Sequence, residues 1–317
     1  MPGIEIFGQS FLLSAPLFGI VFAGYVVARL PFWRPRWTHL ASRAVFVVLI
    51  PALLFHQMSD LSNLPPVDAR LLIAFFGGCF VVFAIGRAIA AWCFRLDGVS
   101  QSVFALGGIF SNNVLLGLPL ARIALGADAL PSVALVLVFN SLTLWTLVSI
   151  SVEWARHGGL SLASLGRTAF KVLTHPIVAA ILLGTACGLA RIPLPWAVTA
   201  PLAALSSAAG PAALLVLGLG LAGYGFLNDL RKSLVICALK LVAQPLVVWG
   251  LAIALDLPAM ELKVAVLLAA LSVGVNVYLM AIHFERLQSA VASSLVLSTA
   301  LAVFTTPTLL AFLHALA

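Results

Sequence analysis

The sequence of 317 residues has few charged side chains. Asp, Glu, Lys and Arg make up 9% of it, against about 25% in an average soluble domain, while hydrophobic residues make up 63% and the mean hydropathy is +1.17. A soluble protein must cover its surface with polar groups, and this chain has too few of them. The composition excludes a soluble enzyme, a nucleic-acid-binding protein and a disordered chain, and it indicates a polytopic membrane protein.

Several patterns that carry chemistry are also missing from the sequence. The four cysteines lie in apolar runs without a CxxC spacing, and no histidine lies four residues from a second histidine or a cysteine, so we expect no metal and no redox site. A Walker A motif is absent, which argues against direct use of ATP. No carboxylate lies in the middle of an apolar run, and no acid pair or Ser/His constellation shares one membrane depth. An enzyme is therefore the least supported function class, and we expect no cofactor.

Apolar runs of about 20 residues, the length that crosses a bilayer core about 30 Å thick, fill the chain. Ten such runs are predicted, at 9–30, 38–59, 69–94, 101–125, 131–154, 172–191, 196–223, 232–255, 262–283 and 289–315. The first run follows MPGIEIFGQS, which has no basic n-region and no small-residue cleavage site, so we expect it to stay as a helix. The gaps are short and rich in Pro and Gly, which leaves no room for a soluble domain.

Basic residues are distributed unequally between alternate gaps. Twelve lie on one side, four on the other (Arg70, Arg122, Arg191 and Lys263), and Lys240 lies within a span. The side rich in Lys and Arg is expected to be cytoplasmic. This predicts a multi-pass protein of the inner (cytoplasmic) membrane with both termini on the periplasmic, outer side.

The loop WARHGGLSLASLGRTAFK divides the ten spans into five and five. The predicted units are a first repeat at 1–154, a cytoplasmic linker at 155–171 and a second repeat at 172–317. Because five is odd, the second half begins on the opposite side of the membrane, and two similar halves form an inverted repeat. The fold class predicted is thus an all-α membrane protein with two inverted five-helix repeats.

The fourth span of each half carries helix-breaking residues near its middle. The segments are GGIFSNNVLLGLPLARIALG and LLAALSVGVNVYLMAIHF. Asn and Gly are poor helix formers, and Pro119 cannot donate a backbone hydrogen bond. Interrupted helices at matching positions indicate a transporter binding site, where half-helix N-termini suit an anion. The alternative is that these small and polar residues only allow close packing of helices.

At these residues the sequence resembles the auxin efflux carrier family, which includes bacterial malonate and malate permease-like proteins. The family pattern F-x-N-T-x-x-x-G-[IL]-P-L is matched by Phe110, Ser111, Asn112, Asn113, Gly117, Leu118, Pro119 and Leu120. Further likeness is found in SRAVFVVLIPALLF, HPIVAAILLG, PAALLVLGLGLAG and LKLVAQPLVVWG, so it covers nearly the whole chain. One departure is Ser272, which stands where the family usually has proline.

The resemblance implies that spans four and nine cross at unwound centres. It implies a scaffold of spans one, two, six and seven, often dimeric, and a mobile domain of spans three to five and eight to ten. Transport would follow a sliding, elevator-like motion of the mobile domain. Gly117 and Pro119 are then residues of the crossover itself.

Candidate substrate-binding residues follow from the two breaks and from polar groups at similar depth. Asn112 holds the family's Asn position, so its amide is expected to donate to a carboxylate, unless it serves only as a cap. The other candidates at the breaks are Asn113, Asn276, Ser111, Ser272 and Gly274. In spans five and eight, Asn140 and Gln244 are candidates that can instead bridge two helices. Arg122, just beyond Pro119, either attracts anions or extends toward the membrane surface.

Lys240 is the basic residue well inside a span. A buried ammonium is costly without a partner, which makes an intramembrane lysine a functional candidate. It can neutralise a substrate carboxylate or take part in proton coupling. It can instead extend toward the surface, or donate to the backbone carbonyls freed at the two breaks.

The function predicted is a secondary transporter or facilitator for a small organic acid anion, and the narrower prediction is malonate. Protons are a candidate coupling ion. The partners expected are the anion, the lipid bilayer and a second copy of the chain. Two alternatives are a membrane sensor that keeps the fold without transporting, and a carrier of an auxin-like aromatic monocarboxylate.

Overall fold

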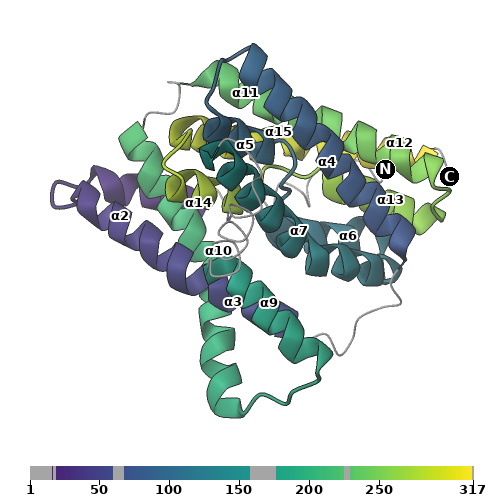
Figure 1. Ribbon diagram of the computed structural model, residues 1–317, viewed down its shortest axis with the longest axis horizontal. Helices are drawn as coiled ribbons and strands as arrows, with labels where there is room; N and C mark the ends of the chain where they lie inside the picture. Colours follow the sequence, from purple (N-terminus) through teal and green to yellow (C-terminus); the bar gives the residue numbers. More distant parts are fainter. Residues whose placement is uncertain (1–15, 17–18, 60–67, 158–175, 225–228, 316–317) are drawn as a thin grey trace.

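The computed structural model describes residue 16 and residues 19–59, 68–157, 176–224 and 229–315. Within these residues the protein is helical, and its β-type pairing is one isolated antiparallel bridge (Figure 1). Most of the predicted linker at 155–171 and both chain termini lie outside the described residues.

Six described helices are long and apolar enough to cross a membrane. They are Pro35–His56, Ala69–Trp92, Leu130–Arg156, Trp196–Gly220, Leu230–Ala254 and Gln288–Thr306. They coincide with six of the ten expected spans, and a chain with several such helices is a multi-pass membrane protein.

The other four expected spans are described only in part or are interrupted. The described parts of two of them are the apolar helices Gly19–Arg29 and α9 (Pro176–Leu189), and the other ends of these expected spans lie outside the described residues. The remaining two are each divided into a pair of half-helices, α5 with α6 and α13 with α14. The count of ten spans stays a prediction.

Aspartates are the N-cap residues of α4 and α5. Asp68 accepts from the backbone N–H of Arg70 at the start of α4 (Ala69–Trp92). Asp97 accepts from the backbone N–H groups of Val99 and Ser100 at the start of α5 (Gly98–Gly107). Such caps pair N–H groups that the first turn leaves free. Partial burial acts to raise the pKa of Asp97, but the hydrogen bonds from Ser100, the charge of Arg286 and the Val99 N–H outweigh it, so the pKa lies below its ordinary value.

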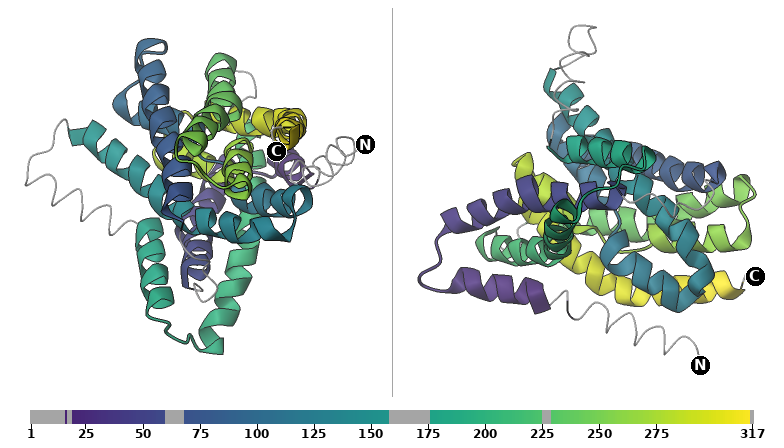
Figure 2. Two further views of the ribbon diagram at one scale, coloured as in Figure 1. Left: turned by 90° about the vertical axis from the view of Figure 1, so that its right-hand side faces the viewer. Right: turned by 90° about the horizontal axis from the view of Figure 1, so that it is seen from below.

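The helices fall into two groups that meet along a seam. In the first group, α3 (Ile50–Ser59) packs on α9 and on α10 (Trp196–Tyr224), and α10 packs on α2 (Pro35–Ala44). α9, the end of α3 and the first part of α10 extend together away from the rest (Figure 1; left panel of Figure 2). The second group holds the remaining helices of the two halves, which are α4, α5, α6 (Leu118–Leu125), α7 (Leu130–His157), α11 (Leu230–Ala238), α12 (Gln244–Ala254), α13 (Ala259–Ala269), α14 (Val275–His283) and α15 (Gln288–Ala315).

Among the described residues, three π-helical turns interrupt the regular helices. They are η1 (Val45–Leu49) between α2 and α3, η2 (Asn113–Gly117) before α6, and η4 (Leu239–Ala243) between α11 and α12. Such turns are rare and are frequent at functional sites. Two of the three adjoin the interrupted spans described below.

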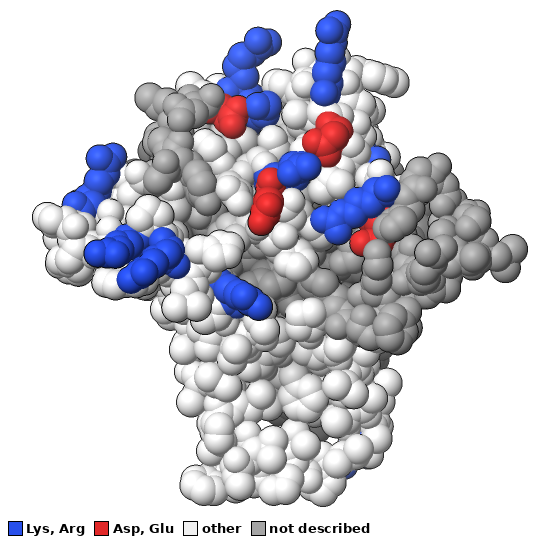
Figure 3. Space-filling model, turned by 60° about the vertical axis from the view of Figure 1, so that its left-hand side comes forward, with Lys and Arg blue, Asp and Glu red and all other residues white. Residues whose placement is uncertain are grey.

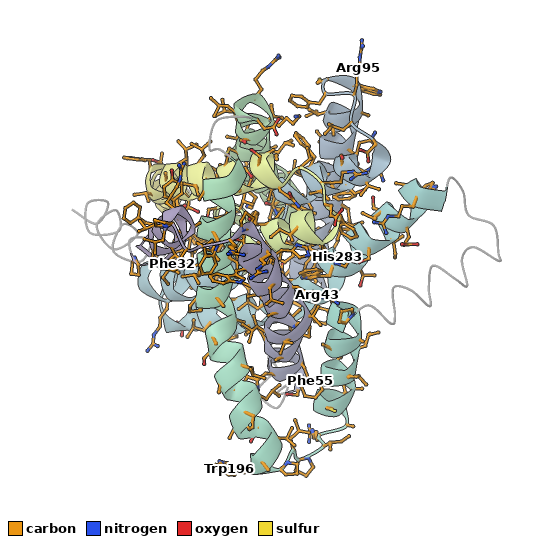
Figure 4. All side chains as sticks on the ribbon, turned by 90° about the vertical axis from the view of Figure 1, so that its left-hand side faces the viewer. Phe32, Arg43, Phe55, Arg95, Trp196 and His283 are labelled. Atoms are coloured by element: carbon orange, nitrogen blue, oxygen red, sulfur yellow. The ribbon has the colours of Figure 1, made fainter. Side chains whose placement is uncertain are left out.

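The surface carries many large apolar side chains, of which Trp92 and Trp196 are 82% and 81% exposed. On the face shown in Figure 3, Lys and Arg side chains gather over the upper part, and the lower part is almost without charge. In Figure 4, Phe55 and Trp196 lie at one end of the molecule and Arg95 at the other. Extended apolar surface of this kind suits contact with lipid.

Candidate functional site

Two interrupted helices meet at the centre of the second helix group. α5 ends at Gly107, and the chain becomes helical again at Asn113. α13 ends at Ala269, and α14 begins at Val275. The sequence thus located both breaks, and the second forms with Ser272 in the place of proline.

The two breaks are paired through their backbones. Ser111 and Val273 form the antiparallel bridge. The N–H of Asn112 donates to the carbonyl of Ser272 at 3.0 Å, and the N–H of Gly274 donates to the carbonyl of Phe110 at 2.7 Å. Unwound backbone inside a membrane must find partners within the protein, and each break supplies them to the other.

Gly274 allows this close approach. A Cβ at this position would lie 3.0 Å from both the Phe110 ring and the Ser111 carbonyl oxygen. That separation is shorter than nearly all real Cβ contacts. A side chain at position 274 would therefore push the two segments apart.

A cavity of about 230 Å³ lies beside the paired breaks. Six of the predicted site residues line it, namely Ser111, Asn112, Asn113, Asn140, Gly274 and Asn276. They come from both breaks, from α7 and from the first turn of α14. Residues about 160 positions apart in the sequence thus share one cavity.

Several polar atoms in this lining have no hydrogen-bond partner in the described structure. They are the Ser111 hydroxyl, both amide atoms of Asn113 and the amide oxygen of Asn140, on side chains that are 2%, 2% and 4% exposed. Buried polar groups are nearly always paired in native proteins. Groups left unpaired around a cavity are therefore suited to bind a polar ligand.

The first turn of α14 adds electrostatic attraction for an anion. Gly274 is its N-cap residue, with an extended backbone and no side-chain cap in the described structure, and Val275 and Asn276 line the cavity. The N-terminal end of a helix carries about half a positive elementary charge. No cluster of three or more metal-binding side chains occurs in the described part of the chain.

The structure places three other predicted residues away from the cavity. Lys240 and Gln244 are fully buried behind the paired breaks, and Ser272 is fully buried within its break. The Lys240 ammonium donates to the carbonyl of Ala269, and the Gln244 amide donates to the carbonyl of Ile109 at 2.9 Å. Arg122 lies on α6 with an exposed side chain.

The two crossover residues lie where the chain regains its helix after the first break. Gly117 ends η2, and a Cβ there would lie 2.9 Å from the side chains of Leu268 and Leu271. Pro119 is the second residue of α6, which continues η2 directly, and its ring nitrogen cannot donate to a carbonyl of the preceding π-helical turn.

Sequence reasoning missed one wall of the cavity. α10 contributes Ser206, Ser207, Gly210 and Pro211, and α3 and α7 contribute Ile50, Leu53 and Leu137. The segment SSAAGP in the seventh predicted span was a signal for this wall, because it places small and polar residues in the middle of an apolar run. Ser298 of α15, which accepts from the N–H of Val273 at 3.0 Å, had no comparable signal.

Comparison with known proteins agrees with the resemblance seen in the sequence. A model of the family described as "Membrane transport protein" matches residues 11–158 and 160–310. The chain is also 26% identical over 303 residues to a protein of Rhizobium meliloti (strain 1021) described as "Putative malonate transporter", covering 94% of each chain. The family description and the description of this relative both indicate a transporter. The chain belongs to the membrane transport protein family, which is the auxin efflux carrier type of transporter.

Proposed function

We propose that the protein is a secondary transporter or facilitator that carries a small organic acid anion, such as malonate, across the cytoplasmic membrane. The observation that carries this proposal is the cavity at the paired breaks, where unpaired amides and the uncapped start of α14 face one space. N–H groups and a positive helix end are the features that bind a carboxylate. The similarity to the Rhizobium meliloti protein described as "Putative malonate transporter" supports the same ligand class.

The size of the cavity favours a small anion over an aromatic one. Its volume of about 230 Å³ is below the roughly 300–1,000 Å³ of pockets that hold drug-sized ligands. We therefore place malonate and similar dicarboxylates ahead of auxin-like compounds.

The proposed architecture is ten spans in two inverted five-helix repeats. Corresponding helices and breaks of the two halves have similar lengths, which supports this architecture. In the first half, α4 has 24 residues, α5 has 10 and the break spans 108–112. In the second half, residues 230–254 are continuously helical, α13 has 11 residues and the break spans 270–274. With both termini outside, the twelve basic residues of the first set lie in the cytoplasm.

The proposed motion is a slide of the second helix group along the first, in the manner of an elevator. The small cavity lies on the seam, because α3 and α10 form one wall and the breaks form the other. A second cavity of about 680 Å³ lies on the same seam and is lined by Ser42, Leu219, Gly220 and Ile282 among others. We refer to it as the vestibule.

With the proposed orientation, the position of the vestibule supports an inward-facing state. On α10 its lining begins about eight residues beyond Pro211, which is about 12 Å at 1.5 Å per residue. The displacement is toward the turns that hold Arg34 and Arg36, the predicted cytoplasmic side. In Figure 4, Arg43 and His283, which adjoin lining residues Ser42 and Ile282 in the sequence, lie between the two ends of the molecule.

The first helix group is the proposed stationary scaffold and the surface through which two copies associate as a homodimer. Proton coupling is the proposed energy source, since the described structure has no cluster of acidic side chains that would hold a sodium ion. Sizing of the detergent-solubilised protein by light scattering tests the dimer. Uptake driven by an imposed pH gradient tests the coupling.

Uptake into proteoliposomes tests the function itself. Purified protein is reconstituted and offered labelled malonate, malate and indole-3-acetate. We expect uptake of malonate or malate above that of empty liposomes, and little uptake of indole-3-acetate. Binding of malonate without any uptake would favour the sensor, and preferred uptake of indole-3-acetate would favour the auxin-like carrier.

A further inference from the structure

Two side chains of the helical segment 230–254 donate hydrogen bonds to backbone carbonyls at the C-terminal ends of α5 and α13. Lys240 in η4 donates to the carbonyl of Ala269, the last residue of α13. Gln244, four residues later, donates to the carbonyl of Ile109, two residues beyond the end of α5. Both donors are fully buried. A single turn of helix thus satisfies one freed carbonyl in each half of the protein.

These carbonyls need partners for a physical reason. The last four C=O groups of a helix have no partner within it, and the end carries about half a negative elementary charge. In the middle of a membrane no bulk water is present to pair them. A lysine at a helix C-terminus offsets the negative end, and a glutamine amide donates without adding charge.

The packing around η4 brings the two donors within reach. A Cβ at Gly108 would lie 3.0 Å from the Cβ of Leu239, and a Cβ at Gly107 would lie 2.8 Å from the Ile236 side chain. The end of α5 therefore rests directly against α11 and η4. The π-helical turn Leu239–Ala243 contains Lys240 and ends next to Gln244.

Neither donor lines the cavity at the breaks. The cavity adjoins the N-terminal start of α14, whereas the two donors contact the C-terminal ends of the preceding half-helices. Lys240 has no ion pair among the described residues, and its contact is with backbone. We infer that Lys240 and Gln244 are positioning residues. They hold the two breaks in place relative to each other from the side opposite the cavity, and they act on the anion only through the backbone.

This inference rests on the proposed function and adds a specific consequence for charge selectivity. If Lys240 contacted a dicarboxylate directly, its loss would weaken dianion binding more than monoanion binding. If it holds the backbone, its loss weakens both to the same extent, because the same start of α14 serves both. A neutral donor at position 240 then restores much of the function.

The experiment compares Lys240→Met, which has no donor, with Lys240→Gln, which keeps one. Gln244→Met tests the second contact in the same way, and Lys263→Met, on α13 and away from the breaks, is the matched control. Binding of malonate and of acetate is measured by calorimetry on purified protein. Hydrogen exchange of residues 270–276 is followed by mass spectrometry without any ligand.

We expect Lys240→Met to lose about tenfold or more in affinity for both anions and to exchange faster at 270–276. Lys240→Gln should retain affinity within a few fold, and Lys263→Met should match the wild type. A selective loss of malonate binding in both Lys240 variants, or unchanged exchange and affinity in Lys240→Met, would overturn the inference. If Lys240→Met does not fold, Lys240→Gln and Gln244→Met carry the same comparison.

The exchange measurement separates the two proposals. If the wild type binds neither anion, the proposed function fails. Faster exchange in Lys240→Met then still supports the positioning role, and unchanged exchange contradicts it.

Discussion

Asn113 offers a test in which stability and binding are expected to change in opposite directions. Its side chain is 2% exposed, it lines the cavity at the breaks, and both of its amide atoms lack a partner in the described structure. The substitution Asn113→Leu keeps the approximate shape of the side chain and removes both polar atoms. The protein without ligand should tolerate the change, because a buried polar group without a partner costs about 1–3 kcal/mol.

Binding should suffer from the same substitution. The Asn113 amide can donate to a carboxylate, and a hydrogen bond to a charged group contributes about 1.5–3 kcal/mol. Losing one such bond corresponds to about a tenfold to hundredfold loss of affinity. We therefore expect a thermal midpoint in detergent that is unchanged or higher, with a Kd for malonate raised by at least about tenfold.

Ser149→Ala is the matched control. Ser149 lies on α7, is 6% exposed and also has a hydroxyl without a partner in the described structure, but it does not line the cavity. Its removal should leave the Kd and the uptake rate unchanged. The reasoning would be refuted if Asn113→Leu folded normally and bound the anion as the wild type does. It would also be refuted if the substitution lowered the thermal midpoint clearly below that of the wild type.

Three further predictions address the crossing, the helix caps and the topology. Gly274→Ala should destabilise the protein by about 1–3 kcal/mol through overpacking and abolish uptake, while Gly250→Ala, where a Cβ meets nothing within 4 Å, should be neutral; equal thermal midpoints would contradict this. Asp97, whose pKa is lowered in the folded protein, should add stability above its unfolded pKa of about 3.9 and lose it as the pH falls through the lower folded pKa. Asp97→Asn should therefore reduce the drop in thermal midpoint on acidification, and an unchanged pH profile would argue against the cap. Cysteines introduced at Arg95 and Arg191, in a variant without native cysteines, should react with an impermeant maleimide from opposite sides of the membrane, and labelling from one side would disprove the proposed topology.

The amino-acid sequence determined the helical class and the places where helices fail. In lipid, backbone groups must be paired within the protein, and an α-helix pairs them within its own segment, so a run of apolar residues predicts a helix without knowledge of its neighbours. The same rule makes Asn112, Asn113 and Gly274 informative, because helix-breaking residues inside such a run need an explanation. The structure has a break at both positions.

The second break shows where local reasoning was incomplete. Ser272 keeps its backbone N–H, so the sequence alone left open how far this helix is interrupted. In the structure the carbonyl of Ser272 accepts from Asn112 in the other half of the chain. The break is complete because a distant segment supplies the hydrogen bonds that the helix would otherwise supply itself.

Only the tertiary structure decided which side of the breaks each polar residue faces. Lys240, Gln244 and Asn140 were equivalent in the sequence, as polar groups in apolar spans, but Asn140 lines the cavity and the other two reach carbonyls behind it. Ser206 and Ser207 complete the cavity from a helix that sequence reasoning did not assign to the site. Helical periodicity relates the residues of one helix to each other, whereas the neighbour that covers each face is set by the packing of all the helices.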